Sequence, residues 1–338
     1  MSTLGKIELQ GRDVPPLLDR VYINRWDTLQ MGRCRYGVML REDGIVRDDG
    51  TTSRLDSTHY LMTTTTANAV AITQYIERLL QIDWPELDVY ATSVTEHWAA
   101  AALSGPKARQ VLAQLVDIDV SNDAFPFLTV AACRIRTANG DISARLFRVS
   151  YSGELAYEIH VASNQGRAMW EAVLDAGQAF GIMPYGTEAM NTLRVEKGHV
   201  VIGAEIDGRT TAADLGMEKL LSPHKWCIGK PLLTRPALNA PDRWQLVGLT
   251  AQGGAPMPRG AKIVADPDRA MPNPTLGHVT SWCFSPNLGA WIALALLSRG
   301  RSRYGETLWA VSPLAEAKVQ VTVGPSCFID PSGDRLRV

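Results

Sequence analysis

The chain has 338 residues, of which 46% are hydrophobic and 20% charged, and this length and composition suit about two ordinary domains. A disordered or collagen-like chain is excluded. The 34 basic and 35 acidic residues leave a net charge of −1, which argues against nucleic acid or an anionic membrane as the main partner.

The sequence also predicts a cytoplasmic protein with reduced thiols. It contains no apolar run long enough for a transmembrane helix, and its first ten residues, MSTLGKIELQ, lack the apolar core of a signal peptide. The five cysteines are scattered and form no CxxC pair. This pattern favours free thiols over a disulfide framework or a zinc knuckle.

Short strands and helices alternate in the first third of the chain. In order, we expect a strand around Ile7 and Leu9, a helix over 15–22, a hairpin of 35–40 and 44–47, extended segments at 51–55 and 60–66, and a helix over 72–80. Proline is tolerated in the first turn of a helix, and Asp43-Gly44 is typical of a hairpin turn.

The middle of the chain continues this mixture. We expect a helix capped by Ser104 or Gly105, strands at 130–136 and 144–149 around the Asn139-Gly140 turn, a strand at 157–161, and helices over 169–180 and 184–197. On the strand 157–161, Tyr157, Ile159 and Val161 alternate with polar residues. Side chains on a strand alternate between its faces, so Glu158 is expected on the face opposite the apolar set.

The amino-acid composition changes near residues 230–243, where a polar stretch contains three prolines, and we interpret this stretch as a linker. Six strand-like segments follow, at 245–251, 262–265, 277–281, 291–297, 307–311 and 318–323. Short strands at this spacing predict a small β-barrel or sandwich. We therefore expect a body over 1–235 and a second domain over 243–338.

Several common kinds of chemistry have no motif here. Neither GxGxxG after a strand nor GxxxxGK[ST] occurs, so we expect no NAD or flavin bound by this chain. The six histidines show no metal-ligand spacing, and HExxH is missing, so no metal site is expected. Without GxSxG, a serine hydrolase is disfavoured.

Seven segments, spread over nearly the whole chain, share an order and spacing with a known family. They are STLGKIELQG (2–11), RYGVMLREDGIVRDDGT (35–51), SGPKARQVL (104–112), RVSYSGELAYEIHV (148–161), YGTEAMNTLRVEKGHVVIG (185–203), IGKPLL (228–233) and LGHVTSWCFSPNLGAWIALALL (276–297). Together they resemble the folate-dependent aminomethyltransferases, the family of the glycine cleavage T-protein. STLGKI, RVSYSGE and LRVEKG are most similar to one branch, the C-terminal half of the alpha subunit of heterotetrameric sarcosine oxidase.

The resemblance implies an α+β fold, with an aminomethyltransferase-type folate-binding body over 1–235 followed by a small C-terminal β-barrel over 243–338. It also implies a function. In such oxidases, flavin-containing amine oxidase subunits make an imine, and its carbon passes to tetrahydrofolate to give 5,10-methylenetetrahydrofolate. The resemblance thus implies tetrahydrofolate as cofactor and those flavin subunits as partners, with no oxidase activity in this chain alone.

The chain departs from a full alpha subunit because it begins at the STLGKI segment. We expect either a fragment of a longer protein or a module encoded on its own.

Four residues match the family's site, with Asp49 in the catalytic role. Read alone, Asp48-Asp49-Gly50 is a turn. In the family this carboxylate lies beside the reaction centre, where it stabilises positive charge and accepts a proton. Glu158 matches the pterin-binding glutamate, since a carboxylate accepts from two adjacent donors at once. Tyr36 and Tyr151 match aromatic residues of the folate pocket, although each alone would be interpreted as core.

Other polar residues nearby have simpler interpretations. We expect Arg194 and Glu196 to form a structural ion pair. Met190 occupies the position of a T-protein arginine that binds folate, which weakens the case for tight binding of the folate tail. Lys225 and Lys230 are candidates for contacts with that tail, but exposed lysines usually do nothing specific.

Two other functions stay open at this stage. One is a non-catalytic folate-binding or scaffolding subunit, and the other is a freestanding aminomethyltransferase, which the RVSYSGELAYE motif and Met190 disfavour. The oxidised amine cannot be read from this chain: sarcosine is the default, with dimethylglycine and N-methylglutamate as alternatives.

Overall fold

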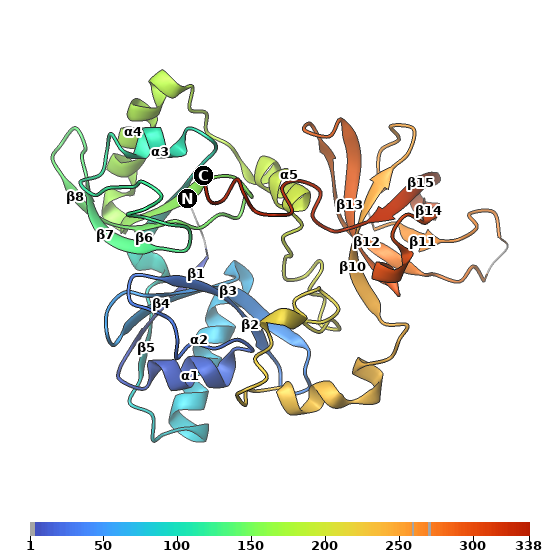
Figure 1. Ribbon diagram of the computed structural model, residues 1–338, viewed down its shortest axis with the longest axis horizontal. Helices are drawn as coiled ribbons and strands as arrows, with labels where there is room; N and C mark the ends of the chain where they lie inside the picture. Colours follow the sequence, from blue (N-terminus) through green and yellow to red (C-terminus); the bar gives the residue numbers. More distant parts are fainter. Residues whose placement is uncertain (1–3, 259, 270–271) are drawn as a thin grey trace.

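Three β-sheets, one of them closed into a barrel, organise the chain (Figure 1). The computed structural model describes residues 4–258, 260–269 and 272–338. Two open sheets lie together at one end of the molecule, and the barrel lies at the other end, beyond helix α5 (Thr187–Lys197) (Figure 1). None of the helices among the described residues has the length and apolar character needed to cross a lipid bilayer.

The first sheet has strand order β2-β3-β4-β1-β5. Its strands are β1 (Gly5–Gln10), β2 (Cys34–Leu40), β3 (Val46–Arg54), β4 (His59–Thr64) and β5 (Tyr90–Ser93). Helices α1 (Val14–Val21) and α2 (Ala69–Arg78) cover one face, because Leu17, Leu18 and Ile76 share a core with Ile7 and Leu9 of β1. The predicted helices and hairpin in this region are confirmed.

The second sheet has strand order β6-β9-β8-β7. Its strands are β6 (Trp98–Ser104), β7 (Val130–Ile135), β8 (Ile142–Phe147) and β9 (Ala156–Ala162). Helices α3 (Ala108–Leu112) and α4 (Gly166–Gly177) cover its outer face, where Tyr157, Ile159 and Val161 are fully buried. The expected alternation of β9 is confirmed, since Glu158 lies on the other face.

That other face meets the first sheet rather than solvent. Arg145 on β8 donates to Glu8 on β1 at 2.7 Å, and Cys34, Leu61 and Phe147 share one apolar cluster. The two sheets therefore enclose a mixed polar and apolar layer.

The C-terminal strands close into a barrel in the order β10-β13-β12-β11-β14-β15. They are β10 (Trp244–Ala251), β11 (Lys262–Val264), β12 (Gly277–Ser285), β13 (Ala290–Ser298), β14 (Thr307–Ser312) and β15 (Ala317–Gly324). All six strands overlap the predicted segments. Because the sheet is closed, the domain is a barrel, the first of the two predicted alternatives, and not a sandwich. The 230–243 stretch contains short 3₁₀ turns, and the exact domain boundaries at 235 and 243 stay a prediction.

Two local predictions are wrong. Asp48, Asp49 and Gly50 lie inside β3, not in a turn, because the chain reverses earlier, at Gly44, whose φ is +89°. The helix predicted after Ser104 begins only at Ala108, with no side-chain cap, since β6 continues to Ser104 in register with β9.

Helix α5 is anchored to the barrel by buried polar groups. Arg194 donates to Glu205 at 3.0 Å and to Ser281 of β12 at 2.6 Å, while Glu196 accepts from Ser285 at 2.5 Å. The expected Arg194–Glu196 pair is wrong, because residues two apart on a helix point in different directions. Gly198, with φ +80°, ends the helix as predicted.

We expect Arg194→Leu to lower the free energy of unfolding by about 3 kcal/mol, because removing one partner of a buried pair leaves the other charge uncompensated. Arg194 is 5% exposed and Glu205 fully buried. Urea unfolding measures the loss. The matched variant Arg167→Leu, which breaks an exposed pair with Glu171, should leave stability unchanged. An equal effect of both variants would contradict the interpretation.

Candidate functional site

Tyr36 and Asp49 form the centre of the candidate site. They lie on adjacent antiparallel strands, where Asp49 is opposite Val38 and Tyr36 is opposite Thr51. The two side chains are diagonal neighbours on one face of the sheet. The Tyr36 hydroxyl donates to Oδ2 of Asp49 at 2.8 Å and lies 3.9 Å from the sulfur of Met217. The structure therefore brings a predicted catalytic carboxylate and a predicted folate aromatic into direct contact.

Burial changes the protonation of both groups. It raises the pKa of Asp49 to about 6, and the charge of Asp48 adds to the rise while the Tyr36 hydrogen bond opposes it. Burial also raises the pKa of Tyr36 well above its ordinary value, helped by the charge of Asp49. Tyr36 is therefore a proton donor at neutral pH, and Asp49 is an ionised carboxylate that can accept a proton within the physiological range.

Tyr151 lies in the segment between β8 and β9, on the side of the site toward α5. The residue is 39% exposed, and its ring stacks on His199 with ring centroids 5.6 Å apart. Nδ1 of His199 lies 3.0 Å from the Tyr151 carbonyl, so it carries the proton of that hydrogen bond. Burial raises the pKa of Tyr151 to about 12, Arg194 opposes the rise, and the charge of Asp49 adds to it. Tyr151 and Asp49 therefore share one electrostatic environment.

Glu158 reaches the layer between the two sheets from β9. Its side chain is 23% exposed. One nearby charge is Lys6 of β1: burial lowers the pKa of this lysine, and the charge of Glu158 opposes that shift. Cys34 connects this region to the rest of the site, because it lies two residues before Tyr36 on β2. Burial raises the pKa of the Cys34 thiol to about 12, and the charge of Glu158 adds to the rise. Glu158 thus faces the same layer as Tyr36 and Asp49.

The two candidate lysines are occupied elsewhere. The Lys225 ammonium donates to the carbonyl oxygens of Asp19 and Tyr22, and the Lys230 ammonium donates to those of Ser222 and Lys225. Lys225 thus connects its loop to the C-terminal end of α1, and Lys230 holds two parts of the same loop together. The structure gives no support for a role of either lysine in binding the folate tail.

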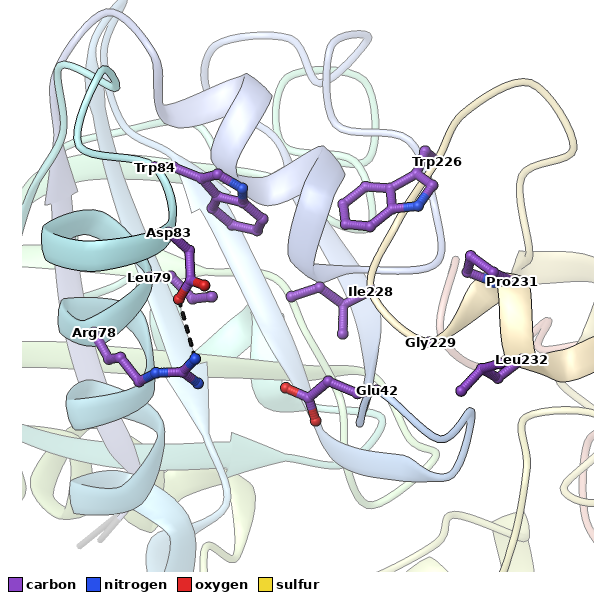
Figure 2. Close-up of a pocket in the computed structure, with 10 residues that line it drawn as sticks. All are labelled: Glu42, Arg78, Leu79, Asp83, Trp84, Trp226, Ile228, Gly229, Pro231 and Leu232. Carbon is purple, nitrogen blue, oxygen red and sulfur yellow. Dashed lines mark ion pairs between the residues drawn. The ribbon is translucent and has the colours of Figure 1, made fainter.

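A separate cavity of about 340 Å³ lies beyond the end of α2 (Figure 2). Trp84 and Trp226 form two walls at an interplanar angle of 85°, and Ile228 lies between them (Figure 2). The residues that line it come from the helix-covered side of the first sheet and from segment 226–232. Tyr36, Asp49, Tyr151 and Glu158 do not line this cavity, so their site is not this pocket.

Sequence reasoning missed several residues that support the site. His160 is recoverable from the sequence, since it lies two residues after Glu158 and therefore on the same face of the strand. Lys6 lies within the STLGKI motif but carries no local sign of burial. His199 and Met217 are brought to the tyrosines by the path of α5 and the segment after it. No spacing in the sequence connects these two residues to positions 36 or 151.

Family models match the chain over most of its length. The model described as the GCVT N-terminal domain matches residues 1–225, and the model of the glycine cleavage T-protein C-terminal barrel domain matches residues 245–330. An aminomethyltransferase from Streptomyces coelicolor is 30% identical over 310 residues, which are 90% of this chain and 79% of that protein.

A longer relative is more similar in sequence. The alpha subunit of sarcosine oxidase from Rhizobium meliloti is 45% identical over 340 residues, which are 100% of this chain and 34% of that subunit. The chain thus spans about a third of that relative, and the expected match to its C-terminal half is corrected to a third of its length. Among solved structures, aminomethyltransferase T of the glycine cleavage system from Bartonella henselae has a TM-score of 0.82 at 21% identity, covering 98% of this chain and 85% of that one. This likeness confirms the fold.

The raised pKa of Asp49 predicts a specific pH dependence. Its folded-state pKa of about 6 lies above the ordinary value of 3.8, so the unfolded chain ionises first as the pH rises and wild-type stability falls. Asp49→Asn does not titrate. As the pH rises from about 4 to about 7.5, we expect the free energy of unfolding of the variant to increase by about 2 kcal/mol relative to that of wild type. Urea unfolding at each pH measures this difference.

Asp43→Asn is the matched control for this experiment. Arg41 lowers the pKa of that carboxyl, so the variant should show no gain over the same pH range. If Asp49→Asn also shows no change relative to wild type, Asp49 ionises as an ordinary aspartate and the raised pKa is refuted.

Proposed function

Because the chain belongs to the aminomethyltransferase family of the glycine cleavage T-protein, we propose that it is a tetrahydrofolate-dependent one-carbon transfer module. Its likeness to a sarcosine oxidase alpha subunit supports a more specific role, in which the module captures the carbon of an imine as 5,10-methylenetetrahydrofolate. The observation that carries the proposal is the Tyr36–Asp49 pair, in which a partly buried carboxylate with a pKa of about 6 accepts a hydrogen bond from a protonated phenol.

The residues present fit a folate. Glu158 offers carboxylate oxygens beside the exposed Ala102, and the ring of Tyr151 is partly open for stacking. Glu158 would accept hydrogen bonds from N3–H and the 2-amino group of the pterin. Tyr36 and Tyr151 would line the same pocket, with Asp49 at the reacting end.

Asp49 has two tasks in this proposal. When bound, tetrahydrofolate would supply two nucleophilic nitrogens, N5 and N10, and their two protons would be released to the departing amine. The Asp49 carboxylate stabilises the positive charge that develops at the carbon, and it carries a proton from a folate nitrogen toward the departing amine. Tyr36 holds the carboxylate in place through the 2.8 Å hydrogen bond.

The imine itself would come from flavin-containing amine oxidase subunits. A free imine hydrolyses in water to formaldehyde and amine, so its capture in an enclosed site prevents loss of the carbon. This reasoning supports a hetero-oligomer in which oxidation and capture occur on different parts of one complex. Sarcosine is the default amine.

We expect the two carboxylates to have separate roles. Glu158→Gln should weaken the binding of folinic acid by about 1–3 kcal/mol, because a charged acceptor is lost. Asp49→Asn should bind folinic acid nearly as well as wild type but slow methylene transfer. Calorimetry measures binding, and 5,10-methylenetetrahydrofolate formation in a reconstituted oxidase measures transfer.

Glu154→Gln is the matched control, since Glu154 precedes Glu158 by four residues and pairs with Arg335 instead. It should leave affinity and transfer unchanged. Equal losses of affinity in the Glu158 and Asp49 variants, with no separate effect on rate, would contradict the assignment. An absence of heat at millimolar folinic acid, or a yellow flavin that copurifies with the chain, would refute the folate module altogether.

A further prediction concerns partners. Co-expression with the oxidase subunits should give a complex that survives gel filtration, and tetrahydrofolate should lower the formaldehyde released from the N-methyl amine. The reason is that captured carbon no longer reaches water. If no complex forms, or if formaldehyde is independent of tetrahydrofolate, the channelled-transfer role is wrong and a scaffolding subunit is the better interpretation.

A further inference from the structure

His160 lies directly behind Glu158 on the inner face of the second sheet. The two side chains share a face of β9 because they are two residues apart. Nε2 of His160 lies 3.4 Å from Oε2 of Glu158. His160 is only 1% exposed, and its ring packs on Phe147 with ring centroids 4.5 Å apart. The imidazole is therefore held in place next to the carboxylate.

The surroundings of the ring select its tautomer. Nδ1 of His160 is buried without a hydrogen-bond partner. A proton on Nδ1 would be an unpaired buried donor, which is costly. An ionised carboxylate can only accept, so a proton on Nε2 is used in a hydrogen bond to Glu158. The neutral Nε2–H form satisfies both conditions, and His160 donates to Glu158.

The neighbouring strand shows which side of Glu158 is open. Ala100 of β6 pairs with His160 and is 1% exposed, whereas Ala102 pairs with Glu158 and is exposed. Over two residues, the inner face of this strand pair thus changes from buried to solvent-exposed. A ligand can approach Glu158 across the small Ala102 side chain, while His160 stays sealed behind the carboxylate.

The other charges near Glu158 do not set its direction. The Lys6 ammonium of β1 feels the charge of this carboxylate, but it donates a hydrogen bond to the Leu4 carbonyl at 3.0 Å. Arg145, which pairs with His160 across β8 and β9, is bonded to Glu8. These two cations contribute charge, whereas His160 contributes a directional hydrogen bond.

We propose that His160 is a positioning residue, which aims the Glu158 carboxylate at the pterin edge of the folate. This inference rests on the proposed folate function and adds a specific residue to it. His160 does not touch the ligand and acts only through Glu158.

The test compares His160→Phe with His160→Gln by calorimetry with folinic acid. Phenylalanine keeps the packing on Phe147 but lacks the N–H, so affinity should fall about five- to tenfold. Glutamine keeps a donor and should stay within about twofold of wild type. In a Glu158→Gln background, His160→Phe should cause no further loss, because a positioning residue acts through its partner.

His278→Phe is the matched control, since this histidine also packs on an aromatic ring, that of Trp244, but lies in the barrel. It should leave the affinity unchanged. Unchanged affinity in His160→Phe, or an equal loss in the Glu158→Gln background, would overturn the proposal. The latter result would assign His160 a purely structural role.

A second measurement tests the hydrogen bond between His160 and Glu158 without any ligand. Nitrogen-15 NMR of the wild-type chain should show His160 as the neutral Nε2–H tautomer, with a shift that changes in Glu158→Gln. An Nδ1–H tautomer or a charged ring would overturn the proposal even if the phenylalanine variant fails to fold. If wild type shows the contact but binds no folinic acid, the proposed folate function fails and the role of His160 toward a pterin fails with it.

Discussion

Charged side chains on the inner faces of the two open sheets must find partners, because a buried charge without a partner is expensive. Glu8 and Arg145 meet this constraint across the layer at 2.7 Å, and Lys6, fully buried, lies near Glu158. These contacts bring the polar faces of two separate sheets together. An apolar layer would pack more easily, but it would offer nothing to a polar ligand.

The same layer explains why its carboxylates differ in character. Burial raises the pKa of Asp49 to about 6, although the hydrogen bond from the Tyr36 phenol opposes the rise. Asp48, next in the chain, points to the other side of β3 and accepts from the amide of Thr65 and the side chain of Asn68. Glu158 is placed among Lys6 and His160 and is open on the Ala102 side. Environment, not residue type, thus gives these three carboxylates different surroundings and different exposure.

The barrel contributes to the site through α5. The buried contacts of Arg194 with Glu205 and Ser281 fix the helix against β12. The chain then leaves the helix at Gly198 and places His199 against the ring of Tyr151. The segment that α5 fixes against the barrel thus supplies the ring that stacks on one aromatic residue of the candidate site.

The sequence by itself determined the features that depend on neighbours along the chain. Period-two alternation placed Glu158 opposite the core face of β9, turn residues located the hairpins, and Gly198 ended α5, although the helix begins at Thr187 rather than at the predicted Pro184. The tertiary structure alone decided the pairings between distant segments. Asp48-Asp49-Gly50 has the composition of a turn, yet pairing with β2 makes it strand. Likewise, Arg194 forms its ion pair with Glu205 rather than with Glu196, because helix geometry and the position of β12 decide which carboxylate the guanidinium can reach. Local patterns report local free energies, whereas burial and pairing depend on chain segments that the patterns do not contain.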